Sequence, residues 1–285
     1  MKKFYHHNMK VAVIILHFGS LETTQTCIAS LYKSEKTPFS LIVINNMPEI
    51  FLPKNFTKRK ITVINNKKNL GFAGGVNVGI RHALKERADA VLLLNNDTII
   101  KKPFLKQLMN RLSSEEVGIV GPAIRFMKNG QKTFDVGGKI NKLFWRTTHN
   151  EVLHLTSKEP RYVTYVSGCC MLIKKEVFKK IGLFDDNFFL YYEDADFCLR
   201  AKKSGFAITL VPSVVIDHLL SKSAGKMSSV AIRHLLKSAI YFGRKYATTP
   251  LQKAANRLFL LVQALLFLRA NPKAALAITQ ALLGD

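Results

Sequence analysis

The sequence predicts an α/β protein with a mostly parallel, Rossmann-like central sheet flanked by helices and a helical extension at the C-terminus. Short apolar runs alternate with helical patterns over the first 125 residues, which is typical of a parallel sheet. The runs are apolar throughout, as expected of strands covered on both faces. With 285 residues, 48% of them hydrophobic, the chain is long enough for a large packed core.

Continuously apolar runs predict the strands of the first half at residues 10–16, 40–44, 61–64, 90–94 and 117–124. Helices are expected at residues 21–33 after a Ser20 cap, at 71–87 after a glycine-rich turn, and from Pro103 as a first helical residue.

The pattern loosens at residues 125–162, which predicts loops and short hairpins. Beyond them we expect strands at 163–173, 207–211 and 214–216, and helices at 174–181, from Glu193 to 203, and at 230–246, 251–268 and 272–283. We therefore divide the chain into a main domain, 1–225, and an amphipathic helical region, 226–285.

The chain is strongly basic, with 43 Lys and Arg against 19 Asp and Glu and a formal charge of +24. This charge suggests a polyanionic partner: nucleic acid, an anionic membrane surface or a phosphate-bearing substrate. The alternative is a general contribution to solubility. The four cysteines form no C-x-x-C pair, so we expect buried thiols in a reducing compartment. The apolar runs 11–16 and 258–268 are too short for a signal segment and a membrane span, which predicts a cytosolic or membrane-surface protein.

Polar residues follow four of the predicted strands: His17, Asn45-Asn46, Asn95-Asn96-Asp97 and Asp217-His218. Ligands of an open parallel sheet bind beyond the carboxyl ends of its strands. Asn and Asp also favour ordinary turns, so each cluster by itself has a purely structural alternative.

Asp97 suits a divalent cation bound to a diphosphate, because such a cation needs only one or two protein carboxylates. His218 adds a nitrogen ligand, which Mn²⁺ accepts more readily than Mg²⁺ does. The turn Gly71-x-x-Gly74-Gly75 before a helix can let the backbone approach a phosphate or sugar, and Asn77 can face the same site. The alternative for these glycines is close packing of helix and strand.

An aromatic run leads to an acidic cluster that contains Glu193, Asp194 and Asp196. Helical spacing places Asp194 on the same stripe as Phe197 and Cys198, facing inward, and places Glu193 and Asp196 nearer the other side. Asp194 is therefore a candidate general base beside an aromatic platform. The alternative is that acids simply favour the first turn of a helix.

Together these motifs resemble the family 2 glycosyltransferases, especially the bacterial rhamnosyltransferase-like members. The resemblance covers residues 10–220 and rests on Asn69-Leu-Gly-Phe-Ala-Gly-Gly-Val-Asn77, Leu92-Leu-Leu-Asn-Asn-Asp97, Val166-Ser-Gly-Cys-Cys-Met-Leu-Ile173, Gly182-Leu-Phe-Asp185, Phe188-Phe-Leu-Tyr-Tyr-Glu-Asp-Ala-Asp196 and the segment Pro212 to His218.

The resemblance implies a GT-A fold, a nucleotide-sugar donor and Mg²⁺ or Mn²⁺. It implies Asp194 as the base for inverting transfer, with Glu193 beside it, and Asp97 and His218 at the metal. The donor would be bound by His17, Asn45, Asn69, Gly71, Gly74, Asn77, Asn95 and Asn96. The acceptor would be bordered by Phe189, Tyr191, Tyr192 and Asp196. Two positions depart from the family pattern: His17-Phe18-Gly19 replaces Asn-Tyr-Asn, and Asn45 replaces an Asp that binds the pyrimidine.

We expect transfer of a sugar, with dTDP-rhamnose favoured by resemblance over other dTDP- or UDP-sugars, to a saccharide or polyprenyl-diphosphate-linked acceptor in bacterial surface polysaccharide synthesis. A nucleotidyltransferase would need a cationic loop after the first strand, and a nucleic-acid-binding protein would need a basic motif; neither pattern is present. The apolar C-terminal helices, flanked by Arg257 and Arg269, suit the inner face of the cytoplasmic membrane or, alternatively, packing on the domain or in a homodimer.

Overall fold

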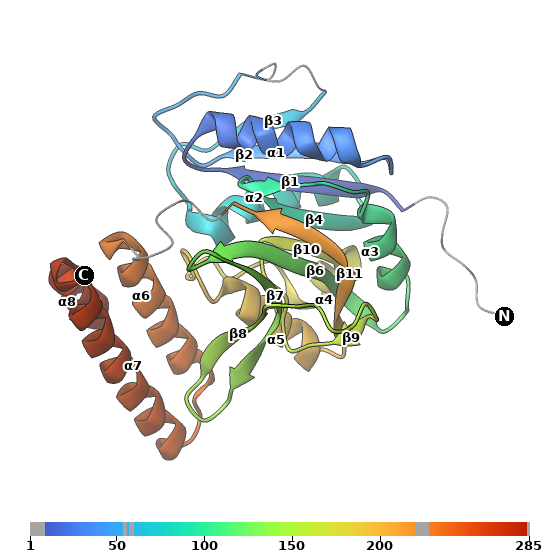
Figure 1. The fold of residues 1–285 in the computed structure, drawn as a ribbon. Helices are drawn as coiled ribbons and strands as arrows, with labels where there is room; N and C mark the ends of the chain where they lie inside the picture. Colours follow the sequence, from blue (N-terminus) through green and yellow to red (C-terminus); the bar gives the residue numbers. More distant parts are fainter. Residues whose placement is uncertain (1–8, 54–55, 57–59, 220–227, 284–285) are drawn as a thin grey trace.

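A computed structural model describes residues 9–53, 56, 60–219 and 228–283 (Figure 1). Among them one eleven-stranded sheet has the order β3-β2-β1-β4-β10-β6-β11-β5, with β7, β8 and β9 attached beside this path. The strands are β1 Val11–His17, β2 Ser40–Asn45, β3 Thr62–Asn65, β4 Ala90–Asn95, β5 Thr98–Ile99, β6 Val117–Lys128, β7 Gln131–Asn141, β8 Arg146–Val152, β9 Arg161–Tyr162, β10 Cys170–Lys174 and β11 Ala207–His218.

Helices cover both faces of the sheet. They are α1 Leu21–Ser34, α2 Gly71–Lys85, α3 Leu105–Leu112, α4 Lys175–Ile181, α5 Glu193–Lys203, α6 Ser229–Tyr246, α7 Pro250–Ala270 and α8 Ala275–Leu283, with a short 3₁₀ turn, Pro272–Ala274, before α8. In β1, Val11, Val13 and Ile15 pack with α1 and α3, whereas Ala12 and Ile14 pack with α2, α4 and α5. This alternation explains why the strand is apolar at every position.

The first half of the sheet has the predicted parallel arrangement. β1 pairs in parallel with β2 and with β4, and β2 pairs in parallel with β3. The registers place His17 opposite Asn45 and Leu16 opposite Asn95. The polar ends of β1, β2 and β4 therefore meet at one edge, as the sequence predicted.

The second half differs from the prediction in three ways. The predicted strand 163–173 is shorter than expected, because β10 begins only at Cys170 and ends at Lys174. β10 runs antiparallel between β4 and β6. The two predicted strands 207–211 and 214–216 are one strand, β11, with a bulge between Val211 and Val215. The loosely patterned residues 125–162 contain the long antiparallel β6–β7–β8 ladder. The sequence did not indicate the strands within these residues because they lack a continuous apolar run, although residues 133–138 of β7 are buried.

The prediction that Pro103 begins a helix is wrong, because α3 begins at Leu105. Its first N–H groups are capped from a distance: Glu35 Oε2 accepts from the backbone N–H of Phe104 and of Leu105, each over 2.9 Å. Burial favours the neutral acid, but these hydrogen bonds outweigh it and lower the pKa of Glu35.

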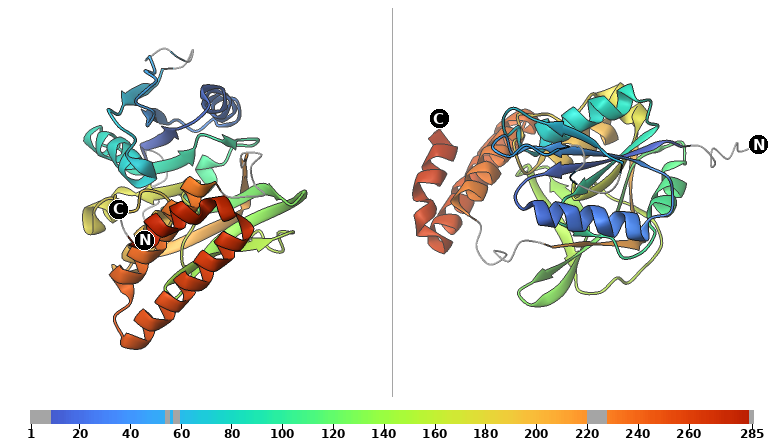
Figure 2. Two further views of the ribbon diagram at one scale, coloured as in Figure 1. Left: turned by 90° about the vertical axis from the view of Figure 1, so that its left-hand side faces the viewer. Right: turned by 90° about the horizontal axis from the view of Figure 1, so that it is seen from above.

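The C-terminal helices lie together beside the sheet domain (Figure 2). α6 packs on the domain through an apolar cluster to which α5, the turn after β7 and the loop before α5 contribute. Its buried members are Trp145, Phe188, Tyr192, Leu199, Ala239, Phe242, Tyr246, Ala247 and Leu260. The predicted boundary at residue 225 lies outside the described residues, and the two-part division stays a prediction.

α7 is longer than the apolar run in the sequence indicated. Among the described helices it is the one long and apolar enough, by length and composition, to cross a membrane, and 17% of its most apolar window is buried. The expectation that this region is too short for a span is therefore wrong by that criterion. Arg257 and Arg269, which flank the apolar run 258–268, both lie within α7.

Candidate active site

The predicted donor residues at the ends of β1 and β4 are joined by hydrogen bonds. His17 is fully buried, and its Nδ1 lies 2.7 Å from Thr24 Oγ1. Asn96 Nδ2 donates to the same Thr24 oxygen over 2.9 Å and to the carbonyl of Phe18 over 3.0 Å. His17 Nε2 has no hydrogen-bond partner among the described residues. Burial lowers the pKa of His17, so the neutral ring can present this nitrogen as donor or acceptor.

The asparagines after β2 and β3 bind one another. Asn45 Nδ2 donates to Asn65 Oδ1 over 2.8 Å and to the Ile50 carbonyl, while Asn45 Oδ1 accepts from the N–H of Met47. Asn45 Oδ1 can accept a second hydrogen bond, but Asn45 is 1% exposed, so its predicted contact with a nucleobase requires a local movement that uncovers this side chain. That contact stays a prediction.

Asn46 and Asn69 tie the loop after β2 to the start of α2. Asn46 Nδ2 donates to Asn69 Oδ1 over 2.8 Å and to the Gly71 carbonyl over 3.0 Å. Asn46 Oδ1 accepts from Asn66 Nδ2 and from the N–H of Leu70. Asn69 therefore shapes this loop, whatever it contributes to a ligand.

The glycine-rich turn allows close packing, the alternative reading of this motif. Gly71 has φ of +70°, and a Cβ there would lie 2.3 Å from the carbonyl oxygen of Phe189. The next residue, Phe72, donates its N–H to that oxygen over 2.7 Å. A Cβ on Gly74 would meet Leu70 Cβ at 3.0 Å. Gly71 thus brings the start of α2 against residues 187–192, here called the aromatic loop. Gly75 lets α2 pack on β1, where a Cβ would lie 2.5 Å from Leu16 Cδ1.

Asn77 lies inside α2 and is 4% exposed. Its Nδ2 donates to the Phe184 carbonyl over 2.8 Å, and its Oδ1 accepts from the Phe184 N–H over 3.0 Å. Both ends of the amide are thus used to hold the turn before the aromatic loop. Its predicted contact with a donor is not supported by this arrangement.

The predicted metal ligands lie side by side. β5 pairs with β11, and this pairing brings Asp97 Oδ1 to within 3.0 Å of His218 Nε2. Among the described residues no group of three or more His, Cys, Asp or Glu side chains is arranged to hold a metal. A carboxylate and an imidazole nevertheless fit a hard cation that completes its coordination with water and diphosphate oxygens. Burial opposes protonation of His218, but neighbouring Cys169 and Asp97 raise its pKa to about 11 in the metal-free protein. A metal ion that binds Nε2 must therefore displace the proton from this nitrogen.

Asp194 is held at the first turn of α5 by two backbone groups. Its Oδ2 accepts from the N–H of Gly168 over 3.0 Å, and its Oδ1 accepts from the N–H of Ala195 over 2.7 Å. Burial raises the pKa of Asp194, although both N–H groups and nearby His149 favour the charged form. A carboxylate with a raised pKa and a fixed orientation suits a general base.

Glu193 has a different environment from its neighbour. It is 7% exposed, and its Oε2 has no hydrogen-bond partner among the residues that the structure describes. Burial and the adjacent Asp194 carboxylate raise the pKa of Glu193 well above its ordinary value. When the pKa values of two neighbouring acids are raised to different extents, the acid whose oxygens accept hydrogen bonds is the one that ionises first. Glu193 is therefore the member of the pair that holds a proton more tightly.

One short segment connects the base to the predicted metal and donor residues. Gly168 donates to Asp194, and the carbonyl of the next residue, Cys169, accepts from the N–H of Asn95 over 2.9 Å. Since neighbouring α-carbons are about 3.8 Å apart, the end of β4 and the start of α5 meet across this segment. The Ser-Gly-Cys-Cys motif thus joins the two predicted halves of the site.

The aromatic residues before α5 occupy different environments. Tyr191 and Tyr192 both have φ of 69°, which is rare for bulky residues and costs about 1–3 kcal/mol each. Tyr192 is buried against Phe242 of α6. Phe189 and Tyr191 are half-buried, and the Phe189 ring stacks on His234 with centroids 4.4 Å apart. Phe189 and Tyr191 are thus the better placed of the predicted acceptor residues.

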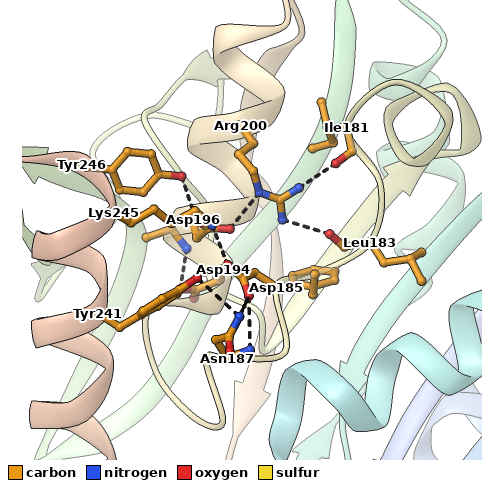
Figure 3. Close-up of polar contacts among 12 residues, drawn as sticks. Ile181, Leu183, Asp185, Asn187, Asp194, Asp196, Arg200, Tyr241, Lys245 and Tyr246 are labelled. Atoms are coloured by element: carbon orange, nitrogen blue, oxygen red, sulfur yellow. Dashed lines mark hydrogen bonds and ion pairs between the residues drawn. The ribbon is translucent and has the colours of Figure 1, made fainter.

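The prediction that Asp194 faces inward while Glu193 and Asp196 lie nearer the other side of α5 is wrong, because Glu193 and Asp196 are buried and Asp194 is only partly buried. Asp196 has the most enclosed environment. Its side chain is fully buried and contacts Arg200 at 2.8 Å, Lys245 at 2.7 Å and Tyr246 at 2.6 Å (Figure 3). α6 covers this side of α5, so the helix has two buried faces. Asp196 is enclosed by these partners, and its predicted contact with an acceptor stays a prediction.

Sequence reasoning missed the contribution of the β7–β8 hairpin. His149 Nδ1 lies 2.7 Å from Asp135 Oδ2. Burial disfavours the charged ring, but Asp135 and the more distant Asp194 raise the pKa of His149 to about 9. His149 therefore supplies positive charge near the candidate base. The loose pattern of residues 125–162 gave no local signal for this role.

Sequence comparisons identify related proteins across most of the chain. A model of the family described as "Glycosyltransferase like family 2" matches residues 7–237. The dTDP-rhamnosyl transferase RfbF of Shigella flexneri is 26% identical over 224 residues, 78% of this chain and 72% of that protein. An N-acetylglucosaminyl-diphospho-decaprenol L-rhamnosyltransferase of Mycobacterium tuberculosis is 25% identical over 234 residues, 73% of this chain and 76% of the relative.

Solved structures share the fold at low sequence identity. GalNAc-T7 with UDP, GalNAc and Mn²⁺ superposes with a TM-score of 0.64 and 14% identity over 84% of this chain, and the match spans 49% of that chain. The mannosyltransferase PcManGT of Pyrobaculum calidifontis, in complex with GDP-Man and Mn²⁺, gives a TM-score of 0.58 and 14% identity over 97% of this chain and 76% of its own.

Proposed function

The chain belongs to the glycosyltransferase-like family 2 and has the GT-A fold, and from this premise we propose that it transfers rhamnose from dTDP-rhamnose to a lipid-linked saccharide with inversion at the anomeric carbon. The choice of sugar is supported by the relatives from Shigella flexneri and Mycobacterium tuberculosis, whose names specify rhamnosyl transfer. The acceptor class is supported by the second of these, whose name specifies a diphospho-decaprenol.

The single observation that carries the proposal is the link between Asp194 and Asn95 through Gly168 and Cys169. It places an oriented carboxylate next to the strand end that precedes Asp97. A transferase needs these two parts together, because the acceptor hydroxyl and the leaving diphosphate lie on opposite sides of the same carbon.

In the proposed reaction Asp194 takes the proton of the acceptor hydroxyl as that oxygen attacks the anomeric carbon. The bond between this carbon and the diphosphate oxygen breaks, and dTDP leaves with the bonding electrons. Attack opposite the leaving group inverts the configuration. Glu193, kept neutral by burial and by the Asp194 carboxylate, adds no second negative charge beside the base.

We assign Asp97 and His218 as the residues that hold Mg²⁺ or Mn²⁺. Such an ion, when bound, neutralises charge on the diphosphate. The donor is placed against the strand ends that carry His17, Asn95 and Asn96. His17 Nε2 is buried and has no hydrogen-bond partner among the described residues, so its contact with the donor requires a local movement that uncovers this nitrogen.

We further propose that α7 rests on an anionic membrane surface at the cytoplasmic side. Six large apolar side chains of α7 are 39–65% exposed: Leu258, Leu261, Val262, Leu265, Leu266 and Leu268. Arg257 and Arg269 are exposed at the ends of this group, where they can meet lipid phosphates. Contact with a bilayer would bring the site toward a membrane-embedded acceptor lipid.

The deciding experiment is a thermal-shift and transfer panel. The protein is mixed with dTDP-rhamnose, other dTDP- and UDP-sugars, and purine nucleotide sugars, each with Mn²⁺ or EDTA. Turnover is assayed with a short-chain N-acetylglucosaminyl-diphospho-lipid. We expect the largest Mn²⁺-dependent shift and turnover with dTDP-rhamnose, and a loss of the Mn²⁺ effect in Asp97→Asn. If no pyrimidine nucleotide sugar binds, the proposed function is wrong.

A further inference from the structure

Lys245 of α6 lies between two carboxylates, one just before the aromatic loop and one in α5 (Figure 3). Its Nζ is 2.6 Å from Asp185 Oδ2 and 2.7 Å from Asp196 Oδ1. Asp185 precedes the aromatic loop, residues 187–192, and Asp196 follows it in the first turn of α5. One ammonium group therefore joins both ends of the loop that leads to Asp194.

The Asp196 carboxylate needs these partners because its side chain is fully buried. A buried charge persists only when it is paired and hydrogen-bonded. Tyr246 donates its hydroxyl to Asp196 Oδ1 over 2.6 Å, and Arg200 donates its Nε to Oδ2 over 2.8 Å. Two of the three partners thus come from α6.

Arg200 extends the hydrogen-bond network of Asp196 to the turn at residues 181–183, which precedes the aromatic loop. Arg200 Nη1 donates to the Ile181 carbonyl and Nη2 to the Leu183 carbonyl, each over 2.9 Å. The orientation of α5 is therefore coupled to the turn that Asn77 also holds.

α6 contacts the aromatic loop at further points. Asp185 Oδ2 accepts from the Tyr241 hydroxyl over 2.9 Å in addition to Lys245. In the middle of the loop, the Leu190 carbonyl accepts from Ser238 Oγ over 2.8 Å. Burial opposes ionisation of Asp185, but Lys245, Asn187 and Tyr241 lower its pKa to about 2. The loop is thus held at its start, middle and end by one helix.

We propose that Lys245 and Tyr246 are positioning residues for glycosyl transfer, which hold the aromatic loop and the first turn of α5 so that Asp194 meets the acceptor hydroxyl. Both lie beyond residue 237, where the match to the family ends. α6 is then a functional part of the catalytic unit and not an accessory to it. The kinetic part of this inference rests on the proposed function.

The test compares Lys245→Met with Arg244→Met. The second variant removes the same charge from the preceding position of α6, where the side chain is exposed. With dTDP-rhamnose and the N-acetylglucosaminyl-diphospho-lipid, we expect Lys245→Met to lower kcat by about 10- to 100-fold, the loss expected when a reacting group is misplaced by about 1 Å. The dTDP concentration that gives the half-maximal thermal shift should stay within about twofold of the wild-type value. The contacts described above for Lys245 and Tyr246 involve the loop before α5 and α5 itself, and do not involve His17, Asn95 or Asn96. Lys245→Arg should restore part of the rate.

Hydrogen exchange of residues 185–196 provides a readout that needs no activity. We expect faster exchange in Lys245→Met and wild-type exchange in Arg244→Met. If wild type turns over no sugar, the proposed function fails while this measurement still decides the positioning role. Unchanged exchange and kcat in a folded Lys245→Met overturn the inference.

If Lys245→Met does not fold, Tyr246→Phe serves as a second variant for the test. It removes one hydroxyl and keeps the ring that stacks on Trp145 at 5.2 Å. A loss of about 10- to 100-fold in kcat with unchanged dTDP binding supports the inference, the size expected for one hydrogen bond to a charged group. Wild-type kcat in this variant overturns it.

Discussion

The backbone N–H of Gly168 donates a 3.0 Å hydrogen bond to Oδ2 of Asp194. The two residues come from the segment before β10 and from the first turn of α5, and this bond is where the two parts of the site meet. A side chain oriented by a backbone donor keeps its place when neighbouring side chains change. The role of the Asp194 carboxylate can therefore be tested by substitutions that preserve the shape of the side chain.

Asp194→Asn keeps the size of the side chain and removes its basicity. We expect a folded protein that binds dTDP as wild type does and transfers sugar about 10²–10⁴ times more slowly, the range for loss of a general base. Asp186→Asn, at an exposed position of the preceding loop, is the matched control. Wild-type turnover in Asp194→Asn would assign the base to another group.

The raised pKa of Asp194 predicts the acid limb of the pH profile. The base works when ionised, so activity is lost as pH falls through its pKa. Because burial raises that pKa, the midpoint of the kcat/KM acid limb should lie above about 3.9, the ordinary value for Asp. The residual rate of Asp194→Asn should lack this limb. A midpoint at or below the ordinary value would contradict the assignment.

Glu193→Gln is expected to stabilise the protein at neutral pH. The pKa of Glu193 is raised by burial and by Asp194, so the folded state holds its proton more tightly than the unfolded state does. Above the unfolded pKa of about 4.3 this difference lowers the stability of wild type, and below it the difference disappears.

Thermal unfolding at pH 7.5 and at pH 4 checks the sign of this effect. The melting temperature of Glu193→Gln should exceed that of wild type at pH 7.5, by roughly 2–4 °C for each kcal/mol. The difference between the two melting temperatures should be smaller at pH 4. A variant that is less stable than wild type at pH 7.5 would show that Glu193 is charged and paired in the folded protein.

Gly71→Ala tests the contact between α2 and the aromatic loop. A Cβ would lie 2.3 Å from the Phe189 carbonyl oxygen, at a residue with φ of +70°. Gly130→Ala is the matched control, since Gly130 has φ of +77° with open space around it. We expect the control to lose about 1 kcal/mol from backbone strain. Gly71→Ala should lose about 1–3 kcal/mol more, the usual cost of overpacking, in chemical denaturation.

The exposed face of α7 is tested by flotation with anionic liposomes. Leu261→Ser with Leu265→Ser should reduce flotation, because these side chains are 56% and 65% exposed. Leu143→Ser with Leu153→Ser removes two exposed leucines elsewhere and should float as wild type does. Added salt should weaken binding if the flanking arginines contact lipid phosphates. Failure of wild type to float would remove the membrane proposal.

Local pattern predicted the elements that a single stretch of sequence encodes. The apolar runs gave β1, β2 and β4 within one or two residues, and Ser20 caps α1 as predicted, accepting from the N–H of Thr23. Gly182 ends α4 with a positive φ. The meeting of polar strand ends at one edge also follows from sequence, because it depends only on the strands being parallel.

The environment of the acidic cluster could not be predicted in this way. A helical wheel assigns one buried face to α5, whereas Asp196 is buried by Lys245 and Tyr246 from about 50 residues later in the chain. Likewise, the amides of Asn45 and Asn77 bind other parts of the protein, and no local pattern distinguishes this from ligand binding.

The fold class, the family and the edge of the sheet where polar residues gather could be inferred from the sequence, because they depend on local periodicity and on motifs in a fixed order. The orientation of those residues required the three-dimensional arrangement, because burial and hydrogen-bond partners depend on contacts between distant segments. These contacts raise the pKa of Glu193, orient Asp194 from Gly168, and tie α6 to α5 through Lys245 and Asp196.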